Sequence, residues 1–354
     1  MKQKIKAVLL LGSFLGLNLA LPAQATEARK HKTTVAKKSD ESASKSAHKP
    51  VAKKSHKSAE KHATKKTPVH AVKADKHTAK VAVSHARKPV HRVSMADMDP
   101  KRLALYSASA LVIDQTTGQP VLEKHPDAVV PIASISKLMT SMVVLDAKLD
   151  LNEVISISEE DVDGLKGTRS RLPVGTSMTR ETAMLLALMS SENRAANALG
   201  RHYPGGLPAF VAAMNRKAQS LGMIHSRFQE PTGLSSNNVS TAQDLARMVS
   251  AAARYPEIRT FSTTAEAKVE MNGRIQQFHT TNPLVRSDNW EIGVSKTGYI
   301  SEAGRCLVMQ ARVADKPVVI VLLDSAGKMT RVGDANRIKR WMESASLAAD
   351  RKRV

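Results

Sequence analysis

The stretch from Thr26 to Val93 contains no Phe, Trp, Tyr, Leu or Ile, and this absence confines any folded core to the rest of the chain. Residues 26–98 are mostly Lys, Ala, His, Ser, Thr and Val, with 19 Lys and Arg against 6 Asp and Glu, a net charge of +13. Such a segment cannot bury enough apolar surface to offset the entropy that is lost on ordering. Residues 26–98 are therefore predicted to be a disordered basic arm.

Residues 1–25 have the three parts of a secretory signal peptide: a lysine-rich start, an apolar run over residues 7–21, and the sequence Ala-Gln-Ala at residues 23–25. A membrane-spanning helix is the alternative, but the apolar run is short and contains glycine, serine and asparagine. Cleavage after Ala25 is therefore expected. No later stretch is long and apolar enough to cross a membrane, so the sequence predicts a periplasmic protein.

Export limits the partners that the basic arm can meet. Its positive charge favours polyanions, and outside the inner membrane these are cell-wall polymers and anionic lipid head groups. Nucleic acid is not expected, because the chain is exported and the arm has no aromatic side chain for base stacking. The alternative is that the arm is a solvated tether, which binds no partner and only extends the distance that the folded domain can reach. The arm also contains eight histidines, but they lie 6 to 17 residues apart, which suits no compact metal site.

The part of the chain from residue 99 onward is about 250 residues long, which is enough for a sizeable core. Cys306 is the single cysteine, so no internal disulfide can stabilise this part, and burial must do so. One folded domain is predicted over residues 99–348, and residues 349–354 are expected to be a short basic tail.

Turn residues and apolar periodicity place strands at both ends of this domain and helices between them. Strands are predicted at 106–114, 120–124, 154–157, 290–298, 305–313 and 318–324, and helices at 134–148, 179–189, 194–203, 208–221, 241–254 and 331–348. Asn272-Gly273 indicates a hairpin between two extended segments. The predicted fold class is α+β: an antiparallel sheet with flanking helices, and a helical lobe with a cleft beside the sheet.

Ser134 and Lys137 are three residues apart at the start of a predicted helix, which places both side chains on one face. A serine hydroxyl becomes a good nucleophile when a neighbouring base takes its proton, and a lysine is such a base only when its pKa is lowered. Burial in a cleft and the positive end of the helix would both lower this pKa. The same spacing recurs three times in the basic arm, where composition explains it. Ser134 is thus the candidate nucleophile and Lys137 its base.

Two further clusters carry groups that such a nucleophile needs. Ser191 and Asn193 lie at a junction of two predicted helices, where the hydroxyl can pass a proton to a leaving amine and the amide can bind a peptide carbonyl. Lys296-Thr297-Gly298 lies on a predicted strand. Its lysine can bind an anion or depress the pKa of the candidate base by repulsion, its threonine can bind a carboxylate, and its glycine lets a substrate backbone lie close.

The order of these clusters resembles a known motif set. Ser-x-x-Lys, then Ser-x-Asn after 57 residues, then Lys-Thr-Gly is the order found in penicillin-binding proteins and serine β-lactamases. A second Ser-Asp-Asn at residues 287–289 is rejected, because it directly precedes the strand that carries Lys-Thr-Gly and cannot face the cleft from the helical lobe.

From residue 105 to 324 the chain resembles the low-molecular-mass penicillin-binding proteins of the D-alanyl-D-alanine carboxypeptidase family (peptidase S11). Within that family it is most similar to the penicillin-binding protein 7/8 type of D-alanyl-D-alanine endopeptidase. Further stretches that look like the family are Ser-Arg-Leu-Pro-Val-Gly at 170–175, Pro-Thr-Gly-Leu-Ser at 231–235, Ser-Thr-Ala-Gln-Asp-Leu-Ala at 240–246, and residues 296–308.

The resemblance implies a serine β-lactamase/transpeptidase-like fold and a serine peptidase that remodels peptidoglycan. Ser134 would attack a D-alanyl carbonyl in a stem peptide or cross-link, Lys137 would take its proton, and Ser191 would relay a proton to the leaving amine. Water would then release the acyl-enzyme, with no metal or organic cofactor. β-Lactam antibiotics are expected as covalent inhibitors.

The same resemblance implies the substrate-binding residues. Asn193 and Thr297 would bind the substrate, Lys296 would support its charge, and Gly298 would lie beside it. The oxyanion would be bound by the backbone N–H groups of Tyr299 and of the nucleophile itself. Each such donor lowers the barrier by about 3–4 kcal/mol.

Two departures from the family favour one reaction over another. Thr281-Asn282 is followed by Pro283, where carboxypeptidase relatives often carry an arginine that binds a terminal carboxylate. This difference favours cleavage of cross-links, and trimming of pentapeptides by a carboxypeptidase is the alternative. The chain also ends soon after Lys296, without the β-rich domain and amphipathic anchor that are common in the carboxypeptidases, so a soluble periplasmic enzyme is expected.

Two other classes of protein share part of this pattern. A class A β-lactamase needs a glutamate in a Glu-x-x-Leu-Asn pattern to activate the deacylating water. Glu230 is the nearest candidate, but its spacing to Leu234 differs by one residue, and it is assigned to the Pro-Thr-Gly-Leu loop. The other alternative is a non-enzymatic wall-binding module in which the basic arm is the functional part, and the three complete clusters argue against it.

Overall fold

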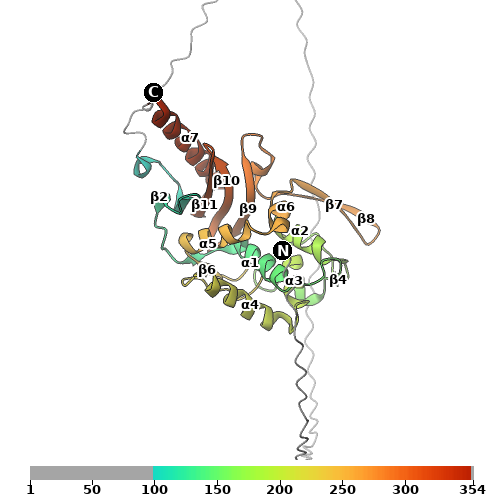
Figure 1. Cartoon of the computed structure of the whole chain (residues 1–354). Coiled ribbons are helices and arrows are strands. Elements are labelled where there is room, and N and C mark those ends of the chain that lie inside the picture. Colours follow the sequence, from blue (N-terminus) through green and yellow to red (C-terminus); the bar gives the residue numbers. More distant parts are fainter. Residues whose placement is uncertain (1–98, 352–354) are drawn as a thin grey trace, which may run out of the picture. The chain divides into compact units, whose positions relative to one another are not determined.

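The computed structural model describes residues 99–351, and this part of the chain forms an antiparallel sheet with helices on both faces (Figure 1). The expected signal peptide, the basic arm and residues 352–354 lie outside the described residues. The predicted α+β class is confirmed, with strands from both ends of the domain and helices between them. Within residues 99–351, no helix combines the length and the apolar character that crossing a membrane requires.

The main sheet has five strands in the order β2-β1-β11-β10-β9, and all neighbours are antiparallel. Its strands are β1 (Ser107–Asp114), β2 (Pro120–Lys124), β9 (Glu291–Ile300), β10 (Gly304–Val313) and β11 (Lys316–Ser325). β11 lies at the centre because residues 318–323 are a continuous apolar run, which a strand buries only when both of its faces are covered. β9 forms one edge of the sheet.

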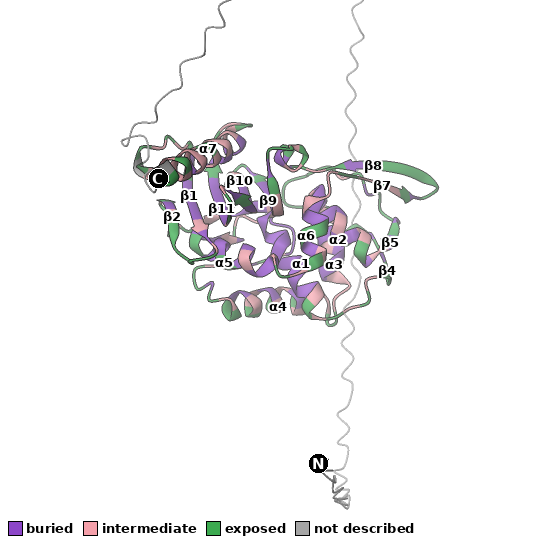
Figure 2. Ribbon diagram, turned by 45° about the horizontal axis from the view of Figure 1, so that its top comes forward, coloured by how far each residue is buried: buried purple, intermediate pink, exposed green. Residues whose placement is uncertain are grey.

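Alternate side chains of β11 enter two separate cores. Val319, Val321 and Leu323 pack against the helical lobe, whereas the residues between them pack under α7 (Thr330–Arg351). Figure 2 shows these buried strands between α7 on one side and the helices of the lobe on the other. α7 extends to Arg351, three residues beyond the predicted end of the last helix.

The helical lobe is built around α1. Its helices are α1 (Ser136–Asp146), α2 (Arg180–Met189), α3 (Asn193–Arg201), α4 (Gly206–Ser220), α5 (Ala242–Ala252) and α6 (Pro256–Thr263). The other five helices all contact α1, and its residues are buried from Ser136 to Val144. A helix that is enclosed on all sides needs no polar face, which explains the nearly unbroken apolar run that follows Lys137.

The predicted hairpin is confirmed as β7 (Glu266–Met271) and β8 (Arg274–His279). Asn272 and Gly273 have φ angles of 52° and 73°, as a two-residue turn with both central residues in the left-handed region requires. Among the described residues, this hairpin is paired only with itself and is mostly exposed (Figure 2).

Several short elements were not predicted. α6 has eight residues and buries little more than Ile258 and Phe261, so it is too short to show a helical period. β3 (Val130–Pro131) and β6 (Val239–Ser240), which pair with each other, were not predicted, nor was β5 (Ser177–Thr179). β5 pairs with β4 (Val154–Ser156), which confirms the strand predicted at 154–157. The 3-10 turns are η2 (Pro100–Arg102), η3 (Ala133–Ile135), η4 (Glu159–Asp161) and η5 (Pro283–Arg286).

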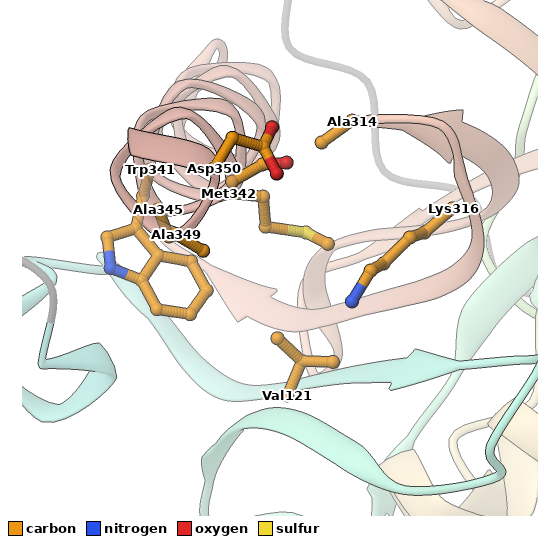
Figure 3. Close-up of a pocket in the computed structure, with 9 residues that line it drawn as sticks. Val121, Ala314, Lys316, Trp341, Met342, Ala345, Ala349 and Asp350 are labelled. Carbon is orange, nitrogen blue, oxygen red and sulfur yellow. The ribbon is translucent and has the colours of Figure 1, made fainter. Parts of the chain in front are cut away.

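A groove of about 300 Å³ lies between α7 and the β2 side of the sheet. Figure 3 shows Trp341 and Met342 of α7 on one side of it, and Val121 of β2 and Lys316 of β11 on the other. The groove is on the α7 face of the sheet, whereas η3 packs on the face that is covered by the helical lobe. It is therefore separate from the residues that the sequence singles out.

Candidate active site

Ser134 lies in the 3-10 turn η3, between β3 and α1, and the regular helix begins two residues later at Ser136. Ala133 has a φ of 49°, in the left-handed region, so the chain turns sharply just before Ser134. This turn packs against β9 and β10. The candidate nucleophile is thus fixed between the edge strand of the sheet and the central helix of the lobe.

Lys137 is fully buried in the first turn of α1, and its amine makes three hydrogen bonds. Its Nζ lies 2.9 Å from Ser134 Oγ, 2.8 Å from Asn193 Oδ1 and 2.6 Å from Thr232 O. Burial lowers the pKa of Lys137 to about 7, although two nearby glutamates act to raise it. Near neutral pH, a large fraction of this amine is therefore uncharged and able to accept a proton.

Ser191 and Lys296 form a second hydrogen-bonded pair. Ser191 lies between α2 and α3 with a φ of 63°, and Lys296 Nζ donates to its Oγ at 2.9 Å. Burial is the main cause that holds the pKa of Lys296 well below its usual range, and repulsion from Lys137 is the second. Burial of Lys137, which the sequence predicts, is the main cause of its lowered pKa, and the predicted repulsion between the two lysines lowers the pKa of Lys296.

Asn193 and Thr297 lie beside these two pairs. Asn193 is the first residue of α3, and while its Oδ1 accepts from Lys137, its Nδ2 donates to Thr168 Oγ1 at 3.0 Å. Thr297 Oγ1 lies 2.6 Å from Thr281 Oγ1. Thr168 and Thr281 are contacts that the sequence analysis missed, and no local pattern marks either of them.

Tyr299 follows Gly298 on β9, at the edge of the sheet. The residue is 56% exposed, and the guanidinium of Arg305 lies over its ring, with Cζ 4.4 Å from the ring centre. The side chain therefore takes no part in the two buried pairs, and any direct role of Tyr299 falls to its backbone.

Two glycines let the backbone pack closely around the turn that contains Ser134. A Cβ atom on Gly298 would lie 2.9 Å from Ile132 O and 3.1 Å from Ser134 N. A Cβ atom on Gly233, whose φ is +82°, would lie 1.9 Å from Ala133 O. Gly298 is expected to lie beside the substrate, and the structure adds that β9 needs a glycine there to pack against the backbone of residues 132–134.

The loop of residues 229–238 supports this packing. The Glu230 carboxylate accepts from the backbone N–H of Thr232 at 2.6 Å, from Thr232 Oγ1 at 2.5 Å, and from the backbone N–H of Gly233 at 2.6 Å. Both of its oxygens are thus occupied within the loop, which weighs against a role in activating water as in a β-lactamase. Asn238, fully buried, donates to Ser136 Oγ at 2.9 Å and so joins the loop to α1.

A second loop, residues 163–168, reaches the site from the lobe. The Asp163 carboxylate accepts from the backbone N–H groups of Leu165, Lys166 and Thr168 at 2.8–2.9 Å, and from Thr168 Oγ1 at 2.6 Å. Lys166 forms an ion pair with Glu302 in the turn between β9 and β10. The loop therefore connects Asn193 with the edge of the sheet.

Two hollows border these loops. One, of about 410 Å³, is lined by residues 169–171 and 190–193, and the other, of about 430 Å³, by residues 165–166 and by residues of the 229–237 segment. Residues 99–351 contain no group of three or more His, Cys, Asp or Glu side chains placed to bind a metal ion.

Solved structures share this fold. The DD-transpeptidase of Streptomyces K15 aligns with a TM-score of 0.63 and 26% identity over 69% of this chain and 98% of that one. The D-alanyl-D-alanine carboxypeptidase of Mycobacterium tuberculosis aligns with a TM-score of 0.61 and 26% identity over 67% of this chain and 91% of that one. The predicted transpeptidase-like fold is confirmed, and the chain is a serine hydrolase of the penicillin-binding type.

The family model described as D-alanyl-D-alanine carboxypeptidase, peptidase S11, matches residues 93–327, so the chain belongs to this family, as the motifs predicted. A D-alanyl-D-alanine endopeptidase of Pseudomonas aeruginosa is 49% identical over 252 residues, which are 71% of this chain and 81% of that protein. A D-alanyl-D-alanine endopeptidase of Escherichia coli is 48% identical over 243 residues, 68% of this chain and 78% of that protein.

Proposed function

We propose that this chain is a D-alanyl-D-alanine endopeptidase that cleaves the peptide cross-links of peptidoglycan through an acyl-enzyme on Ser134. The observation that carries the proposal is the 2.9 Å hydrogen bond between Ser134 Oγ and Nζ of the fully buried Lys137, whose pKa is about 7. A base with this pKa is suited to catalysis at neutral pH. Identities of 49% and 48% to two endopeptidases support the type of bond cleaved.

In the acylation step, neutral Lys137 takes the proton of Ser134 as Oγ bonds to the D-alanyl carbonyl carbon. The backbone N–H groups of Ser134 and Tyr299 stabilise the charge that develops on the carbonyl oxygen. Asn193 and Thr297 bind polar groups of the substrate peptide. Preorganised donors of this kind need no rearrangement during the reaction.

Breakdown of the tetrahedral adduct releases an amine that needs a proton. Ser191 passes to this amine the proton that Lys137 removed, and Lys296 orients Ser191 through their 2.9 Å hydrogen bond. Water then attacks the acyl carbonyl, restores the hydroxyl of Ser134, and leaves a free D-alanyl carboxylate on the cut strand.

The segment before β9 favours a cross-link as the substrate. Asn282 accepts from the backbone N–H of Leu284 at 3.1 Å, and Pro283 is the first residue of η5. The chain therefore places a rigid turn where a carboxypeptidase would place an arginine for a terminal carboxylate. The amine that a cross-link releases belongs to another stem peptide and is not a terminal D-alanine. The second candidate is carboxypeptidase activity on stem pentapeptides, which the description of the family model favours.

We also propose that the chain works in the periplasm and that its arm binds anionic wall polymers or lipid head groups. The signal-peptide pattern of residues 1–25 and the net charge of +13 on residues 26–98 support this placement. Co-sedimentation of the chain with purified peptidoglycan sacculi, compared with a chain that begins at residue 99, tests the role of the arm. Binding that is independent of both arm and salt would contradict it.

The test of the catalytic proposal is intact mass spectrometry of the chain with benzylpenicillin over time, beside Ser134→Ala. We expect a long-lived adduct that the variant lacks. Digestion of cross-linked and uncross-linked muropeptides then separates endopeptidase from carboxypeptidase activity. An adduct that disappears within seconds while the drug is consumed would identify a β-lactamase. No adduct and no digestion would overturn the proposal.

A further inference from the structure

A chain of three hydrogen bonds leads from Asp163 to the candidate base. Thr168 Oγ1 donates to Asp163 Oδ2 at 2.6 Å, Asn193 Nδ2 donates to Thr168 Oγ1 at 3.0 Å, and Lys137 Nζ donates to Asn193 Oδ1 at 2.8 Å. The first two links do not follow from the motif pattern, because Asp163 and Thr168 lie outside all three clusters.

Each link fixes the direction of the next. Burial raises the pKa of Asp163, but its hydrogen bonds with Thr168 and with the loop backbone outweigh burial and lower the pKa overall. Asp163 is therefore an ionised carboxylate at neutral pH and can only accept. The single hydroxyl proton of Thr168 is committed to it, so Thr168 can only accept from Asn193. The NH₂ group of Asn193 must then face Thr168, and its oxygen must face Lys137.

This orientation decides where the lone pair of Lys137 points. A neutral lysine amine has two N–H bonds and one lone pair. Thr232 O, at 2.6 Å from Nζ, is a carbonyl oxygen and can only accept, and so is the fixed Oδ1 of Asn193. Both N–H bonds are used by these two acceptors. The lone pair is left facing Ser134, the one neighbour of the three with a proton to give.

Reversal of the Asn193 amide would block the base. Its NH₂ group would donate into the lone pair of Lys137, and its oxygen would face Thr168 Oγ1 with no proton between them. A water molecule in place of the threonine hydroxyl does not prevent this reversal, because water can donate as well as accept. The hydroxyl of Thr168 and the carboxylate of Asp163 therefore do something that solvent cannot.

We propose that Asp163 and Thr168 are positioning residues, which orient the Asn193 amide so that the lone pair of Lys137 faces the hydroxyl of Ser134. This inference rests on the proposed role of Lys137 as the base for acylation. Neither residue touches the reacting atoms, and both act through Asn193.

The test uses Thr168→Val, which removes the hydroxyl but keeps the shape of the side chain. Thr168 is exposed, so this change should leave the fold intact. Thr168→Ser keeps the hydroxyl and is the rescue variant. Thr117→Val is the matched control, an exposed threonine in the turn between β1 and β2. For each variant, the second-order rate of acylation by benzylpenicillin is measured from acidic to alkaline pH.

We expect Thr168→Val to lower the plateau rate about tenfold, on the scale of one lost hydrogen bond to a charged partner. The pH midpoint should stay in place or move down, because a reversed Asn193 stabilises neutral Lys137. Thr168→Ser should restore most of the rate, and Thr117→Val should match the wild type. The charged groups that face Lys137 are Lys296 on β9, Glu192 before α3 and Glu230 in the 229–238 loop, and all three are unchanged in these variants.

Three results would overturn the inference. Thr168→Val could react like the wild type, or Thr168→Ser could fail to rescue it. The rate loss could also come with a midpoint that rises toward that of a free lysine, which would mean that water has entered and that the effect is structural. If the wild type itself forms no adduct, the proposed function fails. If the wild type reacts but the variants give one of the three results above, only the positioning role of Asp163 and Thr168 fails.

Discussion

A Cβ atom on Gly233 would lie 1.9 Å from the carbonyl oxygen of Ala133, so the 229–238 loop and the turn that contains Ser134 are in direct backbone contact. The residue before this glycine, Thr232, supplies the carbonyl that accepts from Lys137 at 2.6 Å. This short loop thus packs against the turn that contains the candidate nucleophile, and it also orients the base. The loop depends in turn on Glu230 and Asn238, which bond its backbone.

Gly233→Ala is expected to abolish acylation by penicillin and to lower the melting temperature sharply, because neither backbone segment can move away. Gly175→Ala is the matched control. Its φ is +85°, close to the +82° of Gly233, but among the described residues a Cβ atom there would meet nothing within 4 Å. The control should therefore cost only the conformational strain of a left-handed alanine, about 1–2 kcal/mol. Equal losses in the two variants would contradict the packing argument.

The acylation rate should rise with pH and level off above about 7. Lys137 is protonated below its pKa and then has no lone pair, and burial has lowered that pKa to about 7. Glu192 raises the pKa of Lys137, so Glu192→Gln should move the midpoint to lower pH, and Glu181→Gln on the exposed side of α2 should not. Rapid-mixing measurements of acylation across pH check both. A midpoint near that of free lysine in the wild type would rule out a buried neutral base.

The longer helices and strands could be predicted from the sequence, because their apolar residues recur with a regular period or a turn signal marks their ends. The Asn272-Gly273 turn and the apolar run of β11 are examples. The two-residue β3 and β6 lack such a signal, since both are fixed by tertiary contacts rather than by their own sequence.

The candidate site was predictable where its residues belong to spaced motifs, as Ser134 and Lys137 do. The polar residues that orient them were not. Asn238 and Thr168 act through single hydrogen bonds to distant segments, and one polar residue in a loop leaves no periodic trace. The pKa of Lys296 also needed the structure, because it depends on burial and on a lysine 159 positions earlier.

Asn238→Ala is expected to destabilise the domain by more than about 3 kcal/mol, because the fully buried side chain makes four hydrogen bonds that alanine cannot replace. Its amide donates to Ser136 Oγ and to the carbonyl of Glu230, and accepts from the backbone N–H groups of Gln229 and Glu230. Asn237→Ala is the control, since Asn237 is exposed and only its backbone N–H is bonded. Urea unfolding followed by tryptophan fluorescence measures both. A loss within about 0.5 kcal/mol for Asn238→Ala would show that water satisfies these groups.

Cys306 should not react with a thiol reagent in the folded protein. It is fully buried in the core beside the lobe, and burial raises its pKa to about 11. Because it is the single cysteine of the chain, a colorimetric thiol assay reads it without interference. Reaction should appear only when denaturant unfolds the domain. Rapid reaction at pH 8 without denaturant would mean that the β10 side of the core opens readily.

β1 pairs with β11, so Ser107 lies opposite Ser325, 218 positions along the chain. Lys296 lies on β9, which pairs with β10, and β10 pairs in turn with β11. Until the ribosome has supplied residue 325, the sheet therefore lacks the strand that joins its two ends. A nascent chain that already contains Ser134 and Lys137 therefore has no completed sheet against which to bury them. The ability of this hydrolase to cut peptides therefore begins only after β11 has been synthesised.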